Sequence, residues 1–212
     1  SEISLDLLNF FPDANCLNLG GGFKVARMSY EKNTDIAEVG KRVAASLEDF
    51  YAKTGRKIHI EIEPGTYFVA NNAVLLSTIQ DIGATDKYKF LKLDAGMTEI
   101  IRPTMYGAQH PIEVVSDSNE KEEYVVVGHC CESGDLLTPA PDNGEAISPR
   151  TLNKAAIGDV LIIGGVGAYC AGMSAKHYNS FPEAAEVMLM KDGSFKLIRK
   201  RQRIEQVFEN EI

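Results

Sequence analysis

The feature that most constrains the fold is a strand–helix–strand pattern near the start of the chain that does not recur later. Residues 16–19 read as a short strand ending in Gly20-Gly21-Gly22, and residues 58–62 read as a second strand ending in Glu63-Pro64-Gly65. Between them, over residues 36–51, apolar residues recur at helical spacing. This order predicts a right-handed βαβ unit with parallel strands. Because one such unit cannot cover both faces of a sheet, we expect the sheet to continue in sequence that precedes this chain.

From about residue 67 the pattern changes to short segments rich in β-branched residues and separated by turn residues. The predicted strands are 73–79, 89–93, 124–127, 160–163, 187–190 and 195–198, with a hairpin turn at Asp192-Gly193. The stretch 138–149, which holds three prolines, reads as a loop. The sequence therefore predicts two domains, an α/β portion at residues 1–70 and an antiparallel β-barrel or sandwich at residues 71–212.

The net charge and the cysteine content limit the kinds of ligand and the cellular compartment that we expect for this protein. The 22 Lys and Arg residues are outnumbered by 30 Asp and Glu residues, and the resulting net charge of −8 argues against a nucleic-acid ligand. No apolar run reaches the length of about 18 residues that a membrane-spanning helix needs. The cysteines Cys16, Cys130, Cys131 and Cys170 form no C-x-x-C pair, so we expect no disulfide framework, no metal site and a reducing, cytoplasmic compartment.

The two motifs that end the parallel strands both have properties of ligand-binding loops. The glycine triplet Gly20-Gly21-Gly22 permits positive φ and lets backbone N–H groups approach an anion such as a phosphate. The Glu63 carboxylate would lie at the same edge of the sheet, where it could pair with a cationic ring nitrogen, and the Gly65 amide could add to the anion site. Either motif alone is also consistent with a simple tight turn.

Three later segments carry side chains suited to binding or proton transfer. Arg102 and Tyr106 could hold a carboxylate together, although a surface salt bridge and a half-buried tyrosine fit them as well. Cys131 and Glu132 lie in the polar loop HCCESGD, where a thiol fits a proton donor and a carboxylate fits an ammonium ligand. Tyr169 follows the glycine-rich run GGVG, which fits either a donor beside a ligand or a β-bulge with a core tyrosine.

Taken in order, these motifs resemble those of the diaminopimelate decarboxylases, which are pyridoxal-phosphate enzymes of the alanine-racemase-like group. The matching stretches are LNLGGGF, EIEPGTYFVANNAVL, LDAGMTEIIRPTMYGAQHP, CCESGD and GAYCAGMSAKHYNSFPEAAEV. CESGD and the MSxxxYN stretch are the specific parts, since ornithine and arginine decarboxylases differ there. The resemblance covers nearly the whole chain but only the C-terminal half of such an enzyme. It implies the last βαβ portion of a (β/α)8 barrel followed by an antiparallel Greek-key β-barrel.

The resemblance also implies a cofactor and the residues that bind it. Pyridoxal 5′-phosphate would be held at its ring nitrogen by Glu63, which keeps that nitrogen protonated. Its phosphate would be held by backbone amides and one hydroxyl, from Gly20, Gly21, Gly22, Gly65 and Tyr169.

The resemblance further implies the roles of the residues that meet an amino-acid substrate. Arg102 and Tyr106 would bind its distal carboxylate, and Glu132 its distal ammonium. Cys131 would protonate the α-carbon after carbon dioxide leaves. In this family the sites form at a homodimer interface, so Cys131 and Glu132 would act on the partner's cofactor. His110 and Asp135 would support the structure.

Two departures from the family pattern leave the exact substrate and the activity open. Thr66 stands where the E-P-G-R pattern has arginine, and Lys24 or Arg27 would have to supply that charge. The lysine that bonds to the cofactor belongs to the N-terminal half, so we expect this chain alone to be inactive. The leading hypothesis is the conversion of meso-diaminopimelate to lysine. The alternatives are a decarboxylase of carboxynorspermidine, ornithine, lysine or arginine type, or a non-catalytic dimerisation domain.

Overall fold

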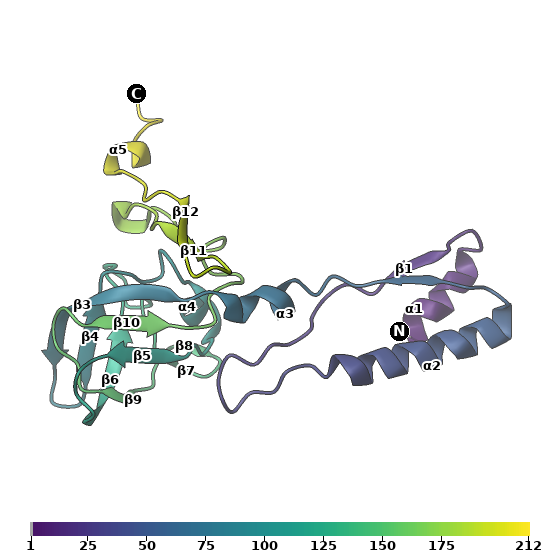
Figure 1. Ribbon diagram of the computed structural model, residues 1–212, viewed down its shortest axis with the longest axis horizontal. Helices are drawn as coiled ribbons and strands as arrows, with labels where there is room; N and C mark the ends of the chain where they lie inside the picture. The colour runs from purple at the N-terminus through teal and green to yellow at the C-terminus, as the bar shows by residue number, and fades with distance from the viewer. Residues whose placement is uncertain (1) are drawn as a thin grey trace. The chain divides into compact units, whose positions relative to one another are not determined.

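The first of two compact units, Ser1–Ala70, is built on two parallel strands and one long helix. The computed structural model describes residues 2–212, with side chains from residue 3 onwards. The elements of this unit are α1 (Glu2–Leu7), η1 (Leu8–Phe10), β1 (Cys16–Asn18), α2 (Ile36–Thr54), β2 (His59–Glu61) and α3 (Gly65–Val69), as labelled in Figure 1. β1 and β2 pair in parallel, with Cys16 opposite His59 and Asn18 opposite Glu61. The predicted βαβ unit is confirmed.

The long helix α2 begins and ends where the sequence supplies caps. The Asp35 side chain accepts a hydrogen bond from the Glu38 N–H at 3.0 Å, which satisfies one free amide of the first turn. Gly55 ends the helix in the left-handed conformation at φ 68°, where a Cβ would be disfavoured. Near this end the helix buries Phe50 in a small core with Leu5 and Leu8.

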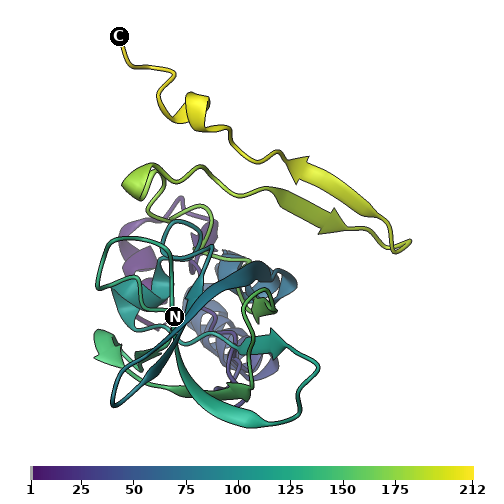
Figure 2. The ribbon, with the colours of Figure 1, turned by 90° about the vertical axis from the view of Figure 1, so that its left-hand side faces the viewer.

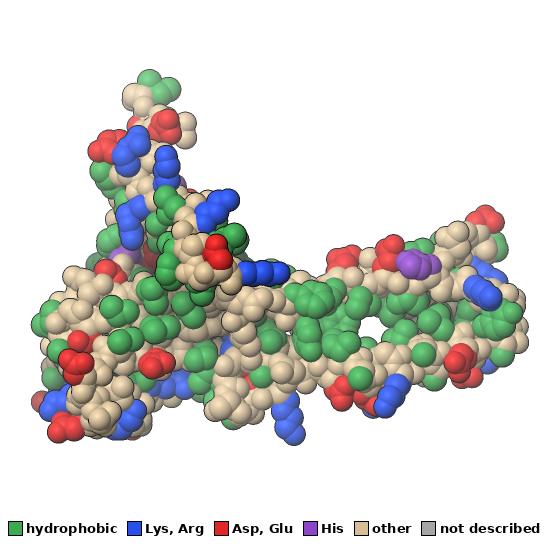
Figure 3. Space-filling model, in the orientation of Figure 1, with side chains coloured by type: hydrophobic (Ala, Val, Ile, Leu, Met, Phe, Trp, Pro, Cys, Tyr) green, Lys and Arg blue, Asp and Glu red, His purple; other side chains and the backbone are tan. Residues whose placement is uncertain are grey.

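Many apolar side chains of the first unit remain in contact with solvent. Figure 3 shows apolar side chains gathered on the face between α2 and the two strands. Phe10 is 78% exposed, Phe68 is 65% exposed and Ile62 is 47% exposed. One βαβ unit does not cover this apolar surface by itself, as the sequence pattern indicates.

The second unit, Asn71–Ile212, contains a mixed six-stranded sheet. In the order β5-β10-β3-β4-β6-β9, its strands are Ile112–Val115, Val160–Ile163, Leu75–Ala84, Lys89–Leu93, Lys121–Val127 and Arg150–Asn153. The remaining elements near or in this unit are η2 (Ala70–Asn72), α4 (Arg102–Tyr106), β7 (Pro139–Ala140), β8 (Asn143–Ile147), η3 (Tyr178–Ser180), β11 (Glu186–Leu189), β12 (Phe195–Arg199) and α5 (Ile204–Val207).

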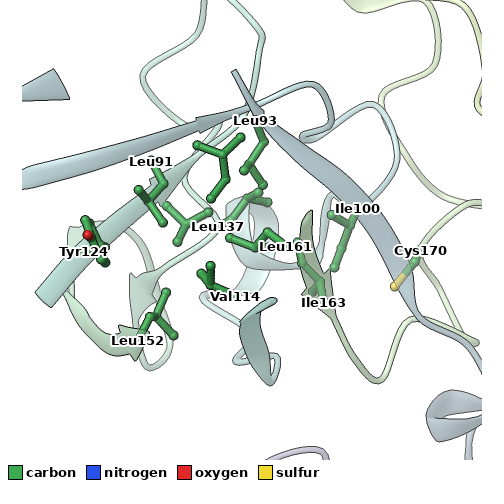
Figure 4. Packing of buried hydrophobic residues seen from close by; sticks show 12 residues of the cluster. Leu91, Leu93, Ile100, Val114, Tyr124, Leu137, Leu152, Leu161, Ile163 and Cys170 are labelled. Atoms are coloured by element: carbon green, nitrogen blue, oxygen red, sulfur yellow. The ribbon is translucent and has the colours of Figure 1, made fainter. Parts of the chain in front are cut away.

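The two edge strands of this sheet approach each other, so that the sheet nearly closes on itself. Asn153 in β9 donates from Nδ2 to the Val114 carbonyl in β5 at 3.3 Å, and Ser116 donates to the Lys154 carbonyl at 2.8 Å. The interior is filled by buried apolar side chains from several strands (Figure 4). They include Leu91, Leu93, Val114, Tyr124, Leu152, Leu161 and Ile163.

Two features of the second unit differ from the expectation drawn from the sequence. β4 and β6 run parallel, with Leu91 opposite Val126, whereas a wholly antiparallel sheet was expected. After β4 the chain forms α4 and then β5, which pairs with β10 at one edge of the sheet. It then crosses back to the other side of β4, where β6 runs in the same direction as β4. The stretch expected to be a loop, residues 138–149, contains the hairpin β7–β8, whose turn includes Asp142 at φ 60°.

The predicted C-terminal hairpin is confirmed. β11 and β12 pair only with each other among the described strands and form a separate two-stranded sheet (Figure 2). Gly193 in the turn has φ 83°, and the Ser194 N–H donates to the Asp192 carboxylate at 2.9 Å. The hairpin exposes apolar side chains from both strands, including Leu189 at 64% and Phe195 at 74%.

Candidate cofactor and substrate site

The glycine triplet and Glu63 lie together at the C-terminal ends of β1 and β2. The Glu63 N–H donates to the Gly20 carbonyl at 2.7 Å. A Cβ added to Gly21 would collide with the Glu63 carbonyl, so only glycine allows the two segments to approach this closely. Gly20 and Gly22 have φ of 71° and 86°, a conformation that residues with a Cβ rarely adopt. The two motifs therefore form one edge of the first unit.

Asn18, at the end of β1, organises this edge and was not identified from the sequence. Its Nδ2 donates to Glu63 Oε1 at 2.8 Å, and its Oδ1 accepts from the Gly20 N–H at 2.7 Å. One amide side chain thus fixes the carboxylate and the start of the glycine loop at the same time. The available sequence signal was a polar residue in the last strand position before the glycine triplet.

The segment after Glu63 forms the short helix α3, and the first N–H group of this helix already donates a hydrogen bond within the chain. The Gly65 N–H, expected to bind an anion, donates to the Glu63 carbonyl at 2.9 Å. Thr66, in the arginine position of the family pattern, lies in the first turn of α3. Lys24, one of the two residues considered as a substitute for that arginine, pairs with Glu31 at 3.4 Å.

This edge fits a ligand that carries both an anion and a basic ring nitrogen. Within residues 2–212, the N–H groups of Gly21 and Gly22 donate to no acceptor. A Cβ added to Gly20 or Gly22 meets no atom within 4 Å, so the loop has space beside it. Amide donors suit a phosphate, and the nearby Glu63 carboxylate suits a protonated nitrogen. The donor set therefore fits the cofactor that the resemblance implies.

In the second unit, Arg102 and Tyr106 occupy the two ends of α4. Gly107 ends this helix at φ 58°, and its N–H donates to the Arg102 and Pro103 carbonyls. The Arg102 Cζ lies 5.7 Å from the centre of the Tyr106 ring, and the buried Arg102 Nε has no hydrogen-bond partner within the described residues. The structure thus brings these two side chains together, with an unused donor on the guanidinium.

The loop that carries Cys131 and Glu132 is anchored by Asp135, which is 3% exposed. Asp135 Oδ1 accepts from the Met97 N–H at 2.7 Å, and Oδ2 accepts from the Cys130 N–H at 2.9 Å. Glycine is required at Gly96 and Gly128, since a Cβ at either would collide with this carboxylate. Asp135 thereby has the structural role that the resemblance implies.

The helix α4 is also tied to this loop. The Thr104 hydroxyl in α4 donates to the Gly134 carbonyl at 2.7 Å. His110, which follows α4, is 2% exposed and has its Nδ1 2.9 Å from the Gly164 carbonyl. Both contacts hold the backbone in place, and His110 lies in the interior, as a supporting residue would.

Cys131 and Glu132 are both exposed, whereas the neighbouring Cys130 is partly buried. Hydrogen bonds from the Gly134 N–H and the Tyr178 hydroxyl lower the pKa of Glu132, so this carboxylate is ionised at neutral pH. Burial, followed by the Asp135 charge, raises the pKa of Cys130 to about 12. Of the two adjacent cysteines, Cys131 is the more exposed to an external substrate.

Tyr169 has an uncommon backbone conformation for a bulky residue. Its φ is 56°, and its side chain is 60% exposed. The left-handed conformation costs about 1–2 kcal/mol for a residue with a Cβ. Backbone strain of this kind is common at functional sites.

Residues 2–212 contain neither a candidate metal centre nor a candidate membrane-spanning helix. No group of three or more His, Cys, Asp or Glu side chains is arranged to hold a metal ion. None of the described helices combines the length and apolar character needed to cross a membrane. All four cysteines are free thiols.

Comparison with known proteins decides the family. Residues 28–167 match the family model described as pyridoxal-dependent decarboxylase, C-terminal sheet domain. The chain belongs to this family. Its members carry the cofactor that the glycine–glutamate edge fits, and the matched region includes the nearly closed sheet and the Cys131 loop.

Individual decarboxylases of this family resemble the chain over most of its length. The diaminopimelate decarboxylase of Escherichia coli K12 is 32% identical over 212 residues, covering 97% of this chain and 50% of that protein. A crystal structure of diaminopimelate decarboxylase has a TM-score of 0.89 with 31% identity and covers 98% of this chain and 51% of that chain. The M. jannaschii enzyme in complex with L-lysine has a TM-score of 0.86 with 29% identity and covers 100% of this chain and 46% of that chain. The chain therefore spans about half the length of the relatives it matches.

Proposed function

We propose that this chain supplies the C-terminal part of a diaminopimelate decarboxylase, which converts meso-2,6-diaminopimelate to L-lysine and carbon dioxide. The observation that carries the proposal is the meeting of Gly20, Gly21 and Gly22 with Glu63 at one strand edge, in a chain of the pyridoxal-dependent decarboxylase family. Two free amides and one carboxylate there match the two charged ends of pyridoxal 5′-phosphate.

The cofactor, when bound, supplies a protonated ring that accepts the electron pair left on the α-carbon as carbon dioxide departs. Glu63 keeps the ring nitrogen protonated, and Asn18 holds Glu63 in place through its 2.8 Å hydrogen bond. The amides of Gly20, Gly21, Gly22 and Gly65 hold the phosphate. To do so, the Gly65 N–H has to be shared with or released from the Glu63 carbonyl, and the Gly20 N–H from Asn18 Oδ1. The hydroxyl of Tyr169, an exposed residue of the second unit, is a further candidate donor to a ligand anion.

The substrate has a second amino-acid group at its distal end, which the second unit is equipped to bind. Arg102, with its unpartnered Nε, and Tyr106 bind the distal carboxylate. Ionised Glu132 binds the distal ammonium. Cys131 gives the proton of its Sγ to the α-carbon, where a C–H bond replaces the broken C–C bond. In the proposed homodimer, Cys131 and Glu132 act on the substrate held by the partner subunit.

Free cysteines support a reducing, cytoplasmic location.

A panel of amino acids tests the substrate. The full-length protein that contains this chain, supplied with pyridoxal phosphate, is assayed for carbon dioxide release from meso-diaminopimelate, carboxynorspermidine, ornithine, lysine and arginine. We expect the highest kcat/KM for meso-diaminopimelate. A higher kcat/KM for any other substrate would assign the protein to a different branch of the family. Thr66 makes this comparison necessary, because the arginine of the family pattern is missing next to the proposed phosphate site.

The activity of the isolated chain is a separate test. We expect the 212-residue chain alone to release no carbon dioxide from meso-diaminopimelate, because none of its lysines matches the cofactor-bonding lysine of the family. Release by the isolated chain would show that a lysine of this chain serves instead. No release of carbon dioxide from any substrate by the full-length protein would favour the non-catalytic dimerisation domain.

A further inference from the structure

We infer that Tyr178 and Asn179 are positioning residues with separate roles. Asn179 sets the position of Cys131, and Tyr178 sets the orientation of the Glu132 carboxylate. This inference deepens the proposed function and rests on it for the roles of Cys131 and Glu132. Both residues belong to the MSxxxYN stretch noted in the sequence, where neither received a role.

The two contacts come from one short turn, η3. Asn179 Oδ1 accepts a hydrogen bond from the Cys131 backbone N–H at 2.8 Å. The Tyr178 hydroxyl donates to Glu132 Oε2 at 3.2 Å. Consecutive residues of one turn thus hold consecutive residues of the loop, which leaves the Cys131 thiol itself unbound.

The turn is fixed to the same unit on both sides of these contacts. Before it, the Ala175 N–H donates to the Met97 carbonyl at 3.0 Å. After it, the Phe181 ring stacks on the His129 ring with the centres 3.6 Å apart. Because His129 lies two residues before Cys131, the stacking fixes the approach of the turn to the loop.

The backbone of the turn is strained, which suits a positioning role better than a stabilising one. Asn179 and Ser180 in the turn have φ of 50° and 62°, and His177, the residue that precedes η3, also has φ 62°. Asparagine adopts the left-handed region more readily than most other residues with a Cβ. Asn179 can therefore take up the φ that the turn requires and also supply a hydrogen-bond acceptor. Both contacts are exposed to solvent, so they contribute little to folding.

Glu132 is further fixed at its other oxygen. Its Oε1 accepts from the Gly134 N–H at 3.0 Å, so Tyr178 decides the direction of the remaining oxygen. A carboxylate fixed on both oxygens can present a defined edge to a substrate ammonium. Loss of the Tyr178 hydroxyl therefore affects substrate binding, whereas loss of the Asn179 acceptor affects the place from which the proton is delivered.

The kinetic test uses two variants in the full-length protein. We expect Asn179→Gly, which suits the left-handed backbone but removes the acceptor, to lower kcat about tenfold with little change in KM, because proton delivery depends on position. We expect Tyr178→Phe to raise KM for meso-diaminopimelate about fivefold with little change in kcat, as the loss of one hydrogen bond predicts. Asn179→Asp, which keeps an acceptor, restores most of kcat. Parallel changes in kcat and KM in both variants would overturn the inference.

A matched control and a readout independent of activity complete the test. Ser180→Gly relaxes the same turn without removing either contact, so an effect as large as that of Asn179→Gly would overturn the inference. Hydrogen exchange in the 212-residue chain measures the Cys131 amide directly, and Asn179→Gly is expected to speed it about fivefold. Unchanged exchange would reject the Asn179 role. A full-length protein without decarboxylase activity would refute the proposed function, while the exchange measurement would still decide whether Asn179 holds Cys131.

Discussion

Asn18 shows how much a single side chain can determine at the candidate site. Its two polar atoms contact Glu63 at 2.8 Å and the Gly20 amide at 2.7 Å, so the carboxylate and the glycine loop share one anchor. An amide is suited to this task because it donates and accepts at once. A carboxylate at the same position would repel Glu63, and an alkyl group would leave both partners unbound.

The first prediction concerns this anchor. Asn18→Ala in the full-length protein is expected to weaken pyridoxal phosphate binding about tenfold, because the loss of two hydrogen bonds of about 1 kcal/mol each leaves Glu63 and the loop free to move. A fluorescence titration with the cofactor measures the change. Asn15→Ala is the control, since Asn15 is exposed at the other end of β1. Equal affinities for Asn18→Ala and the parent protein would rule out a role for this anchor.

The second prediction concerns Cys130, the partly buried thiol next to the proposed acid. The pKa of Cys130 is raised from 9.0 to about 12 by burial and the Asp135 charge, so its thiol remains protonated at pH 8. Iodoacetamide at pH 8, followed by peptide mass spectrometry, is expected to label exposed Cys131 and leave Cys130 unlabelled. Preferential labelling of Cys130 would contradict this environment.

The same shift gives a pH dependence with a definite sign. Below pH 9 the thiol is protonated in both the folded and the unfolded chain, and the favourable environment of the neutral form is fully present. Between pH 9 and about 12 only the unfolded chain ionises at this residue, so the free energy of unfolding falls. Urea titrations of the parent chain and Cys130→Ala across this range are expected to show a smaller decline in the variant.

At the scale of the element, the loop from His129 to Asp135 depends on one buried carboxylate. Both Asp135 oxygens accept backbone N–H groups, and two glycines leave room for them. The loop can therefore present Cys131 and Glu132 to solvent while its base remains rigid. Burial, and after it the charge of the same carboxylate, raises the pKa of Cys130.

The third prediction tests this anchor. Asp135→Asn is expected to lower the free energy of unfolding by about 2–3 kcal/mol, because its NH2 group must face one of the two buried N–H donors. Urea unfolding of the 212-residue chain measures the loss. Asp117→Asn, at an exposed position, is the control and is expected to change stability by less than about 0.5 kcal/mol. A loss no larger than that of the control would refute the anchoring role.

The sequence predicts best those elements whose ends are marked by local chemistry. The strands before Gly20 and Glu63, the helix capped by Asp35 and Gly55, and the hairpin at Gly193 all have such marks, and the structure contains them. The meeting of the glycine triplet with Glu63 followed from the parallel strand order alone. For these parts, spacing and turn residues carry enough information.

Features that depend on contacts between distant parts of the chain could not be predicted from local sequence patterns. The parallel pairing of Leu91 with Val126 is set by the path of the intervening chain, and β5 is only four residues long. Asn18 was noted only as part of the LNLGGGF stretch and Asn179 only as part of the MSxxxYN stretch, since an asparagine becomes an anchor only when the fold brings an acceptor or a donor to it. The anchoring roles of these two asparagines were therefore missed, whereas His110 and Asp135 were named as supporting residues.

At the scale of the molecule, both units leave apolar surface in contact with solvent. In the first unit Phe10 and Phe68 are 78% and 65% exposed, and in the hairpin of the second unit Leu189 and Phe195 are 64% and 74% exposed. Exposed apolar surface of this extent is typical of chains that bind further protein. The incomplete cover of the first unit agrees with the limits of a lone βαβ unit.

The fourth prediction follows from this exposure. The isolated 212-residue chain is expected to bind the apolar dye ANS and to self-associate with rising concentration. Phe195→Lys is expected to reduce both about twofold by removing one of the largest exposed apolar side chains. Dye fluorescence and sedimentation velocity measure the two effects, with Lys196→Gln on the same strand as the control. A monomeric chain without dye binding would show that these side chains are covered in solution.

The most direct test of the whole account compares the two adjacent cysteines in the full-length protein. Lysine formation from meso-diaminopimelate is measured for Cys131→Ala and for Cys130→Ala. The account predicts that Cys131→Ala lowers kcat about 100-fold or more, as expected for loss of a general acid, while Cys130→Ala changes it by less than about threefold. Equal losses in the two variants, or unchanged turnover in Cys131→Ala, would contradict it.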